Sequence, residues 1–170
     1  VVALADRVGS TERILEWVEA APSGAHLGIG TEIHMVQRMA AEHPDKTIVR
    51  LDEYEAAVAQ RDAILAHPVA GPIFASAGKR EHTIACCDEE TGLDCKGRLD
   101  FLQEPRRIVW DLKGCPTADA GLFGANAARM LYHAQLAFYV MGLRANRVEA
   151  AAGLVAVEFS PPWDVAVFTL

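Results

Sequence analysis

The stretch Thr91–Gly114, TGLDCKGRLDFLQEPRRIVWDLKG, decides the fold. Its two arms alternate apolar with polar residues, and Pro105 stands between them where a type I turn favours proline. This pattern predicts a β-hairpin. A turn centred between Pro105 and Arg106 pairs Gln103 with Ile108.

The same register brings charged side chains to one place on the hairpin. Phe101 faces Trp110, Asp100 lies opposite Asp111, and Lys113 follows two residues later on the same face. The sequence therefore predicts two carboxylates and one ammonium group at one spot on a sheet.

Two carboxylates held this close favour a bound cation. Like charges directly opposite each other destabilise a sheet, and partly buried carboxylates repel until one takes up a proton. A divalent cation such as Mg²⁺ removes the conflict, because it prefers carboxylate oxygens and keeps waters for chemistry. A lysine beside the metal can hold the attacking water or stabilise charge on a phosphate. The alternative is a solvated hairpin face with a surface ion pair.

Length and composition indicate a globular protein. The 170 residues are 51% hydrophobic, which predicts a single domain over residues 1–170 with a substantial core. No apolar run approaches the roughly 20 residues that span a bilayer, and we expect no secretory signal, because no basic stretch followed by an apolar one is found at the start. The four cysteines lack a C-x-x-C pair and are expected to be free thiols, so we expect a cytoplasmic location and no membrane association.

The formal net charge of −7 argues against a protein that coats nucleic acid without specificity. It leaves room for an enzyme that acts on nucleic acid, because metal ions offset part of the charge and arginines contact phosphates. The candidate arginines are Arg98, Arg106, Arg107, Arg129, Arg144 and Arg147.

Periodicity along the chain predicts an α/β domain whose mixed sheet is flanked by helices. The helices are expected over 10–18 with Ser10 as N-cap, 31–42 with Thr31 as cap, 52–66 with Asp52 as cap, 69–77, and 125–143. The strands are expected over 46–51, 81–87, the two hairpin arms, 153–159 and 165–170.

The helix predicted over 125–143 is apolar on most of its circumference, with Tyr132, Gln135 and Tyr139 forming one polar stripe. Buried glutamine and tyrosine need hydrogen-bond partners. The stripe is either part of a core with satisfied polar groups or a helix face that borders the metal site.

Four motifs occur in one order along the chain. They are G-x-x-x-H at Gly30–His34, G-x-x-D at Gly97–Asp100, D-x-K at Asp111–Lys113 and Q-x-x-x-Y at Gln135–Tyr139. In this set the chain resembles the PD-(D/E)xK nuclease superfamily, in its RecB/RecE-like branch with exonuclease VIII-like domains. The resemblance covers roughly residues 27–170 and implies a restriction-endonuclease-like core.

The resemblance also implies roles for individual residues. Asp100 and Asp111 would be the metal-binding carboxylates, with His34 as a further ligand and the carbonyl of Leu112 completing the site. Lys113 would activate or position the water that attacks the phosphate.

Other residues would support this centre. Glu81 matches an upstream acidic position, as a ligand of a second metal. Gln135 and Tyr139 would support the active site and the bound strand, and Arg98 would contact DNA. No terminal cysteine set follows the Q-x-x-x-Y helix, so no iron–sulfur cluster is expected.

The function implied is that of a Mg²⁺- or Mn²⁺-dependent deoxyribonuclease. By resemblance it would be a 5′→3′ exonuclease on duplex DNA ends in recombination or phage-type DNA processing, with a homo-oligomer and a single-strand annealing protein as partners. The alternatives are an endonuclease or structure-specific nuclease with the same site, an inactive module that binds DNA ends, and an unrelated domain with a chance ion-paired hairpin.

Overall fold

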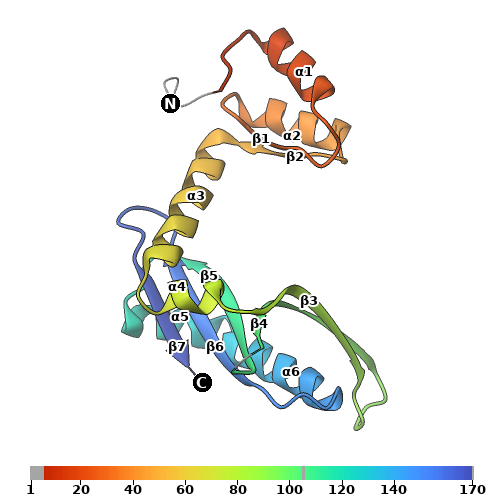
Figure 1. The fold of residues 1–170 in the computed structure, drawn as a ribbon, viewed down its shortest axis with the longest axis vertical. Helices are drawn as coiled ribbons and strands as arrows, with labels where there is room; N and C mark the ends of the chain where they lie inside the picture. Colours follow the sequence, from red (N-terminus) through yellow and green to blue (C-terminus); the bar gives the residue numbers. More distant parts are fainter. Residues whose placement is uncertain (1–5, 105, 170) are drawn as a thin grey trace. The chain divides into compact units, whose positions relative to one another are not determined.

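A computed structural model describes residues 6–104 and 106–169 of the chain. Pro105 in the predicted turn and Leu170 at the end of the last predicted strand lie outside the described residues. The chain divides into two compact units, Val1–Val58 and Ala59–Leu170, and each is described by itself (Figure 1).

The N-terminal unit is a parallel β-α-β motif with one preceding helix. Its elements are α1 (Thr11–Ala20), β1 (His26–Ile29), α2 (Ile33–Glu42), β2 (Thr47–Arg50) and the start of α3 (Leu51–Ala66). β1 and β2 pair in parallel, and apolar side chains of α1, α2 and both strands form one small core. The buried members of that core are Val18, Ile29, Val36, Met39 and Ile48.

Helix starts in this unit agree only in part with the sequence. Ser10 caps α1 as predicted, accepting a hydrogen bond from the amide of Arg13 at 3.4 Å. The other two caps were predicted wrongly. α2 begins at Ile33, one residue later than it would with Thr31 as N-cap. The Thr31 hydroxyl instead donates a hydrogen bond to the Met35 sulfur. Asp52 lies inside the first turn of α3, next to Arg50, and does not precede the helix.

The C-terminal unit is built on one mixed five-stranded sheet, in the order β3-β4-β5-β6-β7. Its strands are β3 (Gly78–Cys87), β4 (Asp94–Gln103), β5 (Ile108–Cys115), β6 (Ala151–Glu158) and β7 (Val165–Thr169). Its helices, after the end of α3, are α4 (Ala70–Ala75), α5 (Ala120–Arg129) and α6 (Tyr132–Ala145). β3, β4 and β5 form an antiparallel meander, whereas β6 joins β5 in parallel after the crossover through α5 and α6.

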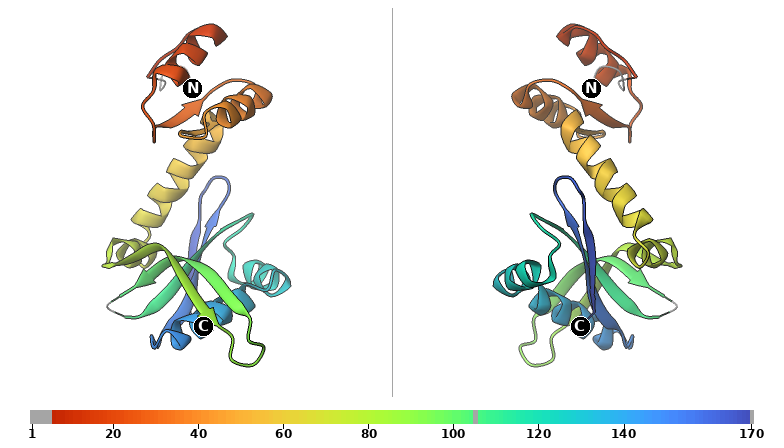
Figure 2. Two further views of the ribbon diagram at one scale, coloured as in Figure 1. Left: turned by 90° about the vertical axis from the view of Figure 1, so that its right-hand side faces the viewer. Right: turned by 90° about the vertical axis from the view of Figure 1, so that its left-hand side faces the viewer.

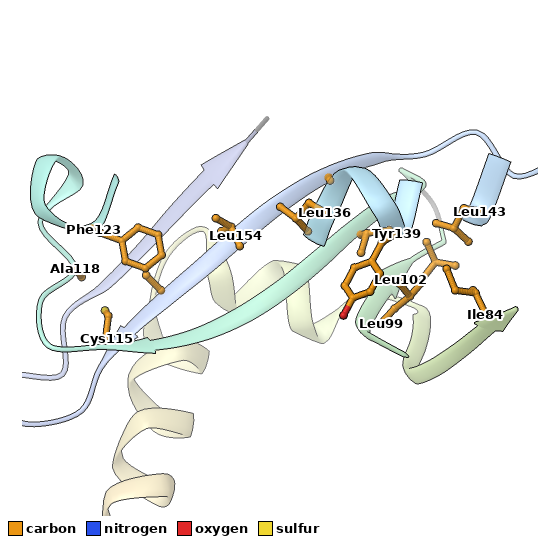
Figure 3. Close-up of a cluster of buried hydrophobic side chains, with 13 residues drawn as sticks. Ile84, Leu99, Leu102, Cys115, Ala118, Phe123, Leu136, Tyr139, Leu143 and Leu154 are labelled. Carbon is orange, nitrogen blue, oxygen red and sulfur yellow. The ribbon is translucent and has the colours of Figure 1, made fainter. Parts of the chain in front are cut away.

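Helices cover both faces of this sheet (Figure 2). On one face, α5 and α6 pack against residues such as Leu99, Val109 and Leu154, and Figure 3 shows this core. On the other face, the end of α3 and α4 pack against Phe101 and Trp110. The predicted fold class, a mixed sheet flanked by helices, is confirmed. No helix in the described part of the chain is both long and apolar enough to cross a membrane.

The hairpin register is confirmed at its two predicted contacts. Gln103 pairs with Ile108 and Phe101 with Trp110. The buried Gln103 side chain holds the turn end of the hairpin, because its Oε1 accepts a 3.1 Å bond from Trp110 Nε1 and its Nε2 donates a 2.9 Å bond to Ser76 Oγ. A buried amide with both ends satisfied favours one register over its neighbours.

The helix predicted over 125–143 is wrong in its boundaries. It is two helices, because Leu131 adopts a left-handed conformation with φ 57° between α5 and α6. α5 also begins earlier than predicted, at Ala120, where the Asp119 carboxylate accepts 3.0 Å bonds from the amides of Gly121 and Leu122. The break contains neither glycine nor proline, so no local signal in the sequence marked it.

Candidate active site

Asp100 lies where the two arms of the hairpin separate. The β4–β5 ladder ends at the Phe101–Trp110 pair, one step before Asp100 would meet Asp111. There the Asp100 carboxylate takes the place of the ladder, because its Oδ2 accepts a 2.7 Å bond from the Leu112 amide. The half-buried Asp100 is thereby held beside β5 at the predicted place.

Asp111 is the buried carboxylate of the site, only 1% exposed. Burial raises its pKa, the neighbouring Lys113 opposes that rise, and the adjacent Asp100 carboxylate adds to it. Lys113 Nζ lies 2.7 Å from Asp111 Oδ2, which is an ion-pair distance, yet no described donor meets this oxygen in hydrogen-bond geometry. The predicted meeting of Asp100, Asp111 and Lys113 is therefore present in the structure, with one ammonium group beside two carboxylates.

The polar stripe of α6 faces this cluster. Gln135 accepts a 3.0 Å bond from Lys113 Nζ through its Oε1, and its Nε2 lies 3.4 Å from Asp111 Oδ1 and 2.7 Å from the Tyr139 hydroxyl. Tyr132 was not assigned to the site from sequence, yet the centroid of its ring lies 4.7 Å from Lys113 Nζ. Its place in the stripe with Gln135 and Tyr139 was the signal that could have assigned it. The helix therefore fixes where the ammonium group points.

Small residues allow α6 to approach the sheet this closely. A Cβ at Gly97, the first residue of the G-x-x-D motif, would lie 3.1 Å from the Tyr139 ring. A Cβ at Gly142 would lie 2.8 Å from the Ile84 side chain. Gly97 therefore has a packing role in the motif, because a side chain there would push Tyr139 and the helix away from β4.

Glu81 stands opposite Asp100 in the β3–β4 register, at a distortion of the strand. Its φ is +49°, and the regular pairs on either side are Arg80–Phe101 and His82–Leu99. The carboxylate forms an exposed 2.7 Å ion pair with Arg98. A surface hollow of about 310 Å³ joins Glu81 to the site, and its lining residues are Phe74, Arg80, Glu81, Asp100, Phe101 and Leu112.

His34 belongs to the other unit. It lies in the first turn of α2, where it is exposed. Its predicted role as a metal ligand stays a prediction.

The donor set of the C-terminal unit fits a divalent cation that is completed by water. Among residues 6–104 and 106–169, no three His, Cys, Asp or Glu side chains converge as a metal site. Two carboxylates do meet, and the buried oxygens of Asp111 are hard ligands beside the Asp100 carboxylate. Mg²⁺ binds in this way in many enzymes, through one or two carboxylates together with waters and substrate phosphate.

A comparison with known protein families identifies the family of this chain. Residues 18–170 match the model of a PDDEXK-like domain of unknown function, DUF3799. The chain belongs to this PDDEXK-like family. This membership confirms the resemblance to the PD-(D/E)xK nuclease superfamily. The superfamily is named after a motif of acidic residues and a lysine, the same residue types that meet on β4 and β5.

A solved structure supports the fold of this PDDEXK-like chain. A protein of Eubacterium rectale, named for an inferred exonuclease activity, superposes with a TM-score of 0.50 at 12% identity. The superposition covers 99% of this chain and 62% of that chain. At this identity the likeness concerns the fold, which is restriction-endonuclease-like.

A second likeness is local. Quinolinate synthases of a Nocardioides species and of Bacillus cereus are 55% and 50% identical to this chain over 53 and 54 residues. These stretches make up 31% and 32% of the PDDEXK-like chain, and the chain covers only 14% and 15% of those enzymes. A likeness of this extent concerns a segment of the protein and leaves its family membership unchanged.

Proposed function

We propose that this PDDEXK-like protein is a metal-dependent deoxyribonuclease whose active site lies between β4, β5 and α6. One observation carries the proposal: the buried Asp111 carboxylate lies beside the Asp100 carboxylate, and the Lys113 ammonium group, 2.7 Å from Asp111 Oδ2, is the cation that accompanies the two acids. Such an arrangement lowers the stability of a fold unless it binds something, since desolvated like charges repel.

Asp100 and Asp111 would hold Mg²⁺ or Mn²⁺, with the Leu112 carbonyl as a further ligand. When bound, the cation would supply the charge that polarises the phosphate and lowers the pKa of a water. Glu81 would join it, or a second ion, after release from Arg98; that ion pair is exposed and hence weak. We also propose His34 as a ligand, which an H34A variant would test by its metal affinity.

The chain's own residues would do the rest of the work. Lys113, held by Gln135 and by the ring of Tyr132, would orient the attacking water and stabilise the charge that develops on the phosphate. Tyr139 would keep the Gln135 amide in place through its 2.7 Å hydrogen bond. Arg98 would bind the DNA backbone once the metal competes for Glu81.

The substrate ends, the polarity of cleavage and the partners are proposed from the resemblance to the RecB/RecE-like branch. We propose hydrolysis from duplex DNA ends in the 5′→3′ direction, in recombination or phage-type DNA processing, with a homo-oligomer and a single-strand annealing protein as partners. An organisation of the whole chain as one nuclease domain is part of the same proposal, supported by a family match that spans both units.

Digestion of linear duplex DNA with Mg²⁺ or Mn²⁺, with and without chelator, tests the proposal. We expect mononucleotides or short products with metal, and none with chelator or with Asp111→Asn. Asp62→Asn is the matched control, because Asp62 is an exposed aspartate on α3 whose ion-pair partner among the described residues is Arg61. Full cleavage by a folded Asp111→Asn protein would refute the assignment.

Substrate topology and polarity separate the remaining alternatives. A circular duplex without ends should resist the enzyme, whereas cutting of the circle would identify an endonuclease. A label at the 5′ end should be released before one at the 3′ end. Binding to DNA ends without release of nucleotides in either metal would identify an inactive binding module.

A further inference from the structure

Two cysteines face each other across the β3–β4 ladder, away from the candidate active site. Cys86 on β3 is the register partner of Cys95 on β4, and both side chains are half-buried. Residues directly opposite in an antiparallel pair have Cα atoms about 4.5–5.5 Å apart. Disulfides span Cα separations of about 4.4–6.8 Å, so the backbone already meets the requirement.

Both sulfurs lie on the face of the sheet that α6 covers. Two positions along the ladder, Ile84 pairs with Gly97, and a Cβ at Gly97 would lie 3.1 Å from the Tyr139 ring. A Cβ at Gly142 on α6 would lie 2.8 Å from the Ile84 side chain and 3.6 Å from Cys86 Sγ. Side chains two residues apart share a face, so Cys86 and Cys95 point to the same side.

The pair is close enough for the two thiols to interact. Desolvation raises the pKa of the Cys86 thiol, and the neighbouring Cys95 adds to the rise through charge and a hydrogen bond. The adjacent Cys87 has a different setting, since it is exposed, faces the opposite side of the sheet and stands opposite Asp94. Of the cysteines on this hairpin, Cys86 and Cys95 are the two in position to react with each other.

We propose that Cys86 and Cys95 are a modification site that closes to an intramolecular cross-strand disulfide in the presence of a small-molecule disulfide oxidant. One thiolate attacks the oxidant, forms a mixed disulfide and releases one small thiol. The second thiolate attacks the protein sulfur of that mixed disulfide and releases the other small thiol. The two cysteines lose two electrons and two protons, which leave in the two reduced thiol molecules.

The disulfide would cross-link β3 to β4 at a distance from Asp100. Cys95 precedes Asp100 by five residues on β4, a separation of about 17 Å along an extended strand. The bond would join the end of β3 to the start of β4 next to the loop 88–93, which is the exposed tip of the β3–β4 hairpin. The inference does not depend on the proposed nuclease activity.

Treatment of the folded 170-residue chain with oxidised glutathione tests the inference. Thiol titration after denaturation should fall from four groups to two, and the intact mass should fall by about 2 Da, the mass of two hydrogens. Cleavage after Glu89 and Glu90 separates Cys86 and Cys87 from Cys95, so a disulfide between the two fragments is visible before reduction and absent after it.

Single serine variants decide which sulfur reacts. Cys87→Ser and Cys115→Ser should close as the wild type does, whereas Cys86→Ser and Cys95→Ser should not. The Cys87→Ser result is decisive, because that variant keeps both proposed partners and alters only an exposed side chain. Failure of Cys87→Ser to close, closure of Cys86→Ser, or uptake of glutathione by the wild type without loss of two thiols would each overturn the inference.

Discussion

Replacing Lys113 with methionine tests how much the ion pair between Lys113 and Asp111 contributes to the stability of the fold. The lysine side chain is 19% exposed and its partner, the Asp111 side chain, 2% exposed, so the pair is buried on the carboxylate side. Methionine fills a similar volume but leaves the buried Asp111 carboxyl without its cation. Breaking a buried ion pair from one side typically costs about 3–5 kcal/mol.

This cost should appear in thermal unfolding followed by circular dichroism. At about 4 °C per kcal/mol for a unit of this size, K113M is expected to lower the Tm by about 12–20 °C at pH 7. The double variant D111N/K113M should recover most of the loss, because the uncompensated charge is gone. Lys79→Met is the control: its pair with Glu104 is exposed and 3.9 Å long, so about 0–1 kcal/mol is expected.

Two outcomes would contradict this reasoning. One is a K113M protein as stable as the wild type at pH 7, which would mean that water reaches Asp111 freely. The other is a double variant no more stable than K113M, which would mean that the lysine stabilises the fold by packing alone. Mg²⁺ should raise the Tm of K113M but not that of the double variant, since the cation needs the Asp111 carboxylate.

Four further predictions concern single residues. Because the pKa of Asp111 is raised in the folded state, its contribution to stability is present at low pH and is lost as pH rises from about 4 through the raised pKa; D111N should therefore gain Tm relative to the wild type over that range, and a constant difference would contradict the shift. Gly153→Ala would place a Cβ 2.4 Å from Trp110 and 2.7 Å from the Phe168 carbonyl, so a loss of about 1–3 kcal/mol or more is expected in urea unfolding. Gly124→Ala, with nothing within 4 Å on helix α5, should instead gain about 0.5–1 kcal/mol. Tyr139→Phe should cost about 1 kcal/mol through the lost bond to Gln135 and lower DNA cleavage more than stability, and unchanged cleavage would remove Tyr139 from the site.

Much of the candidate site was predictable because its residues are close in sequence or follow a short period. The alternation of β4 and β5 set the register of the hairpin, and the register brought Asp100 next to Asp111 and Lys113. The i, i+3, i+7 stripe placed Tyr132, Gln135 and Tyr139 on one helix face. Short-range periodicity is a property of the local chain, so the sequence alone expresses it.

What depended on packing was not predictable. The helix break at Leu131 contains no glycine or proline that would predict it. The strand β1 is too short to show an alternating pattern, with four residues and one buried side chain. Glu81 pairs with Arg98 at a distortion of β3. The Asp100 carboxylate accepts a bond from the Leu112 amide because β4 separates from β5 at this point.

The amino-acid sequence by itself determined the hairpin, its register and the helical stripe, because each follows from the alternation of side chains along a few residues. Only the tertiary structure decided that α6 covers the carboxylates, that Asp111 becomes buried beside Asp100, and that Cys86 faces Cys95. Burial and desolvation depend on which distant segments pack together, and long-range packing is a property of the whole fold.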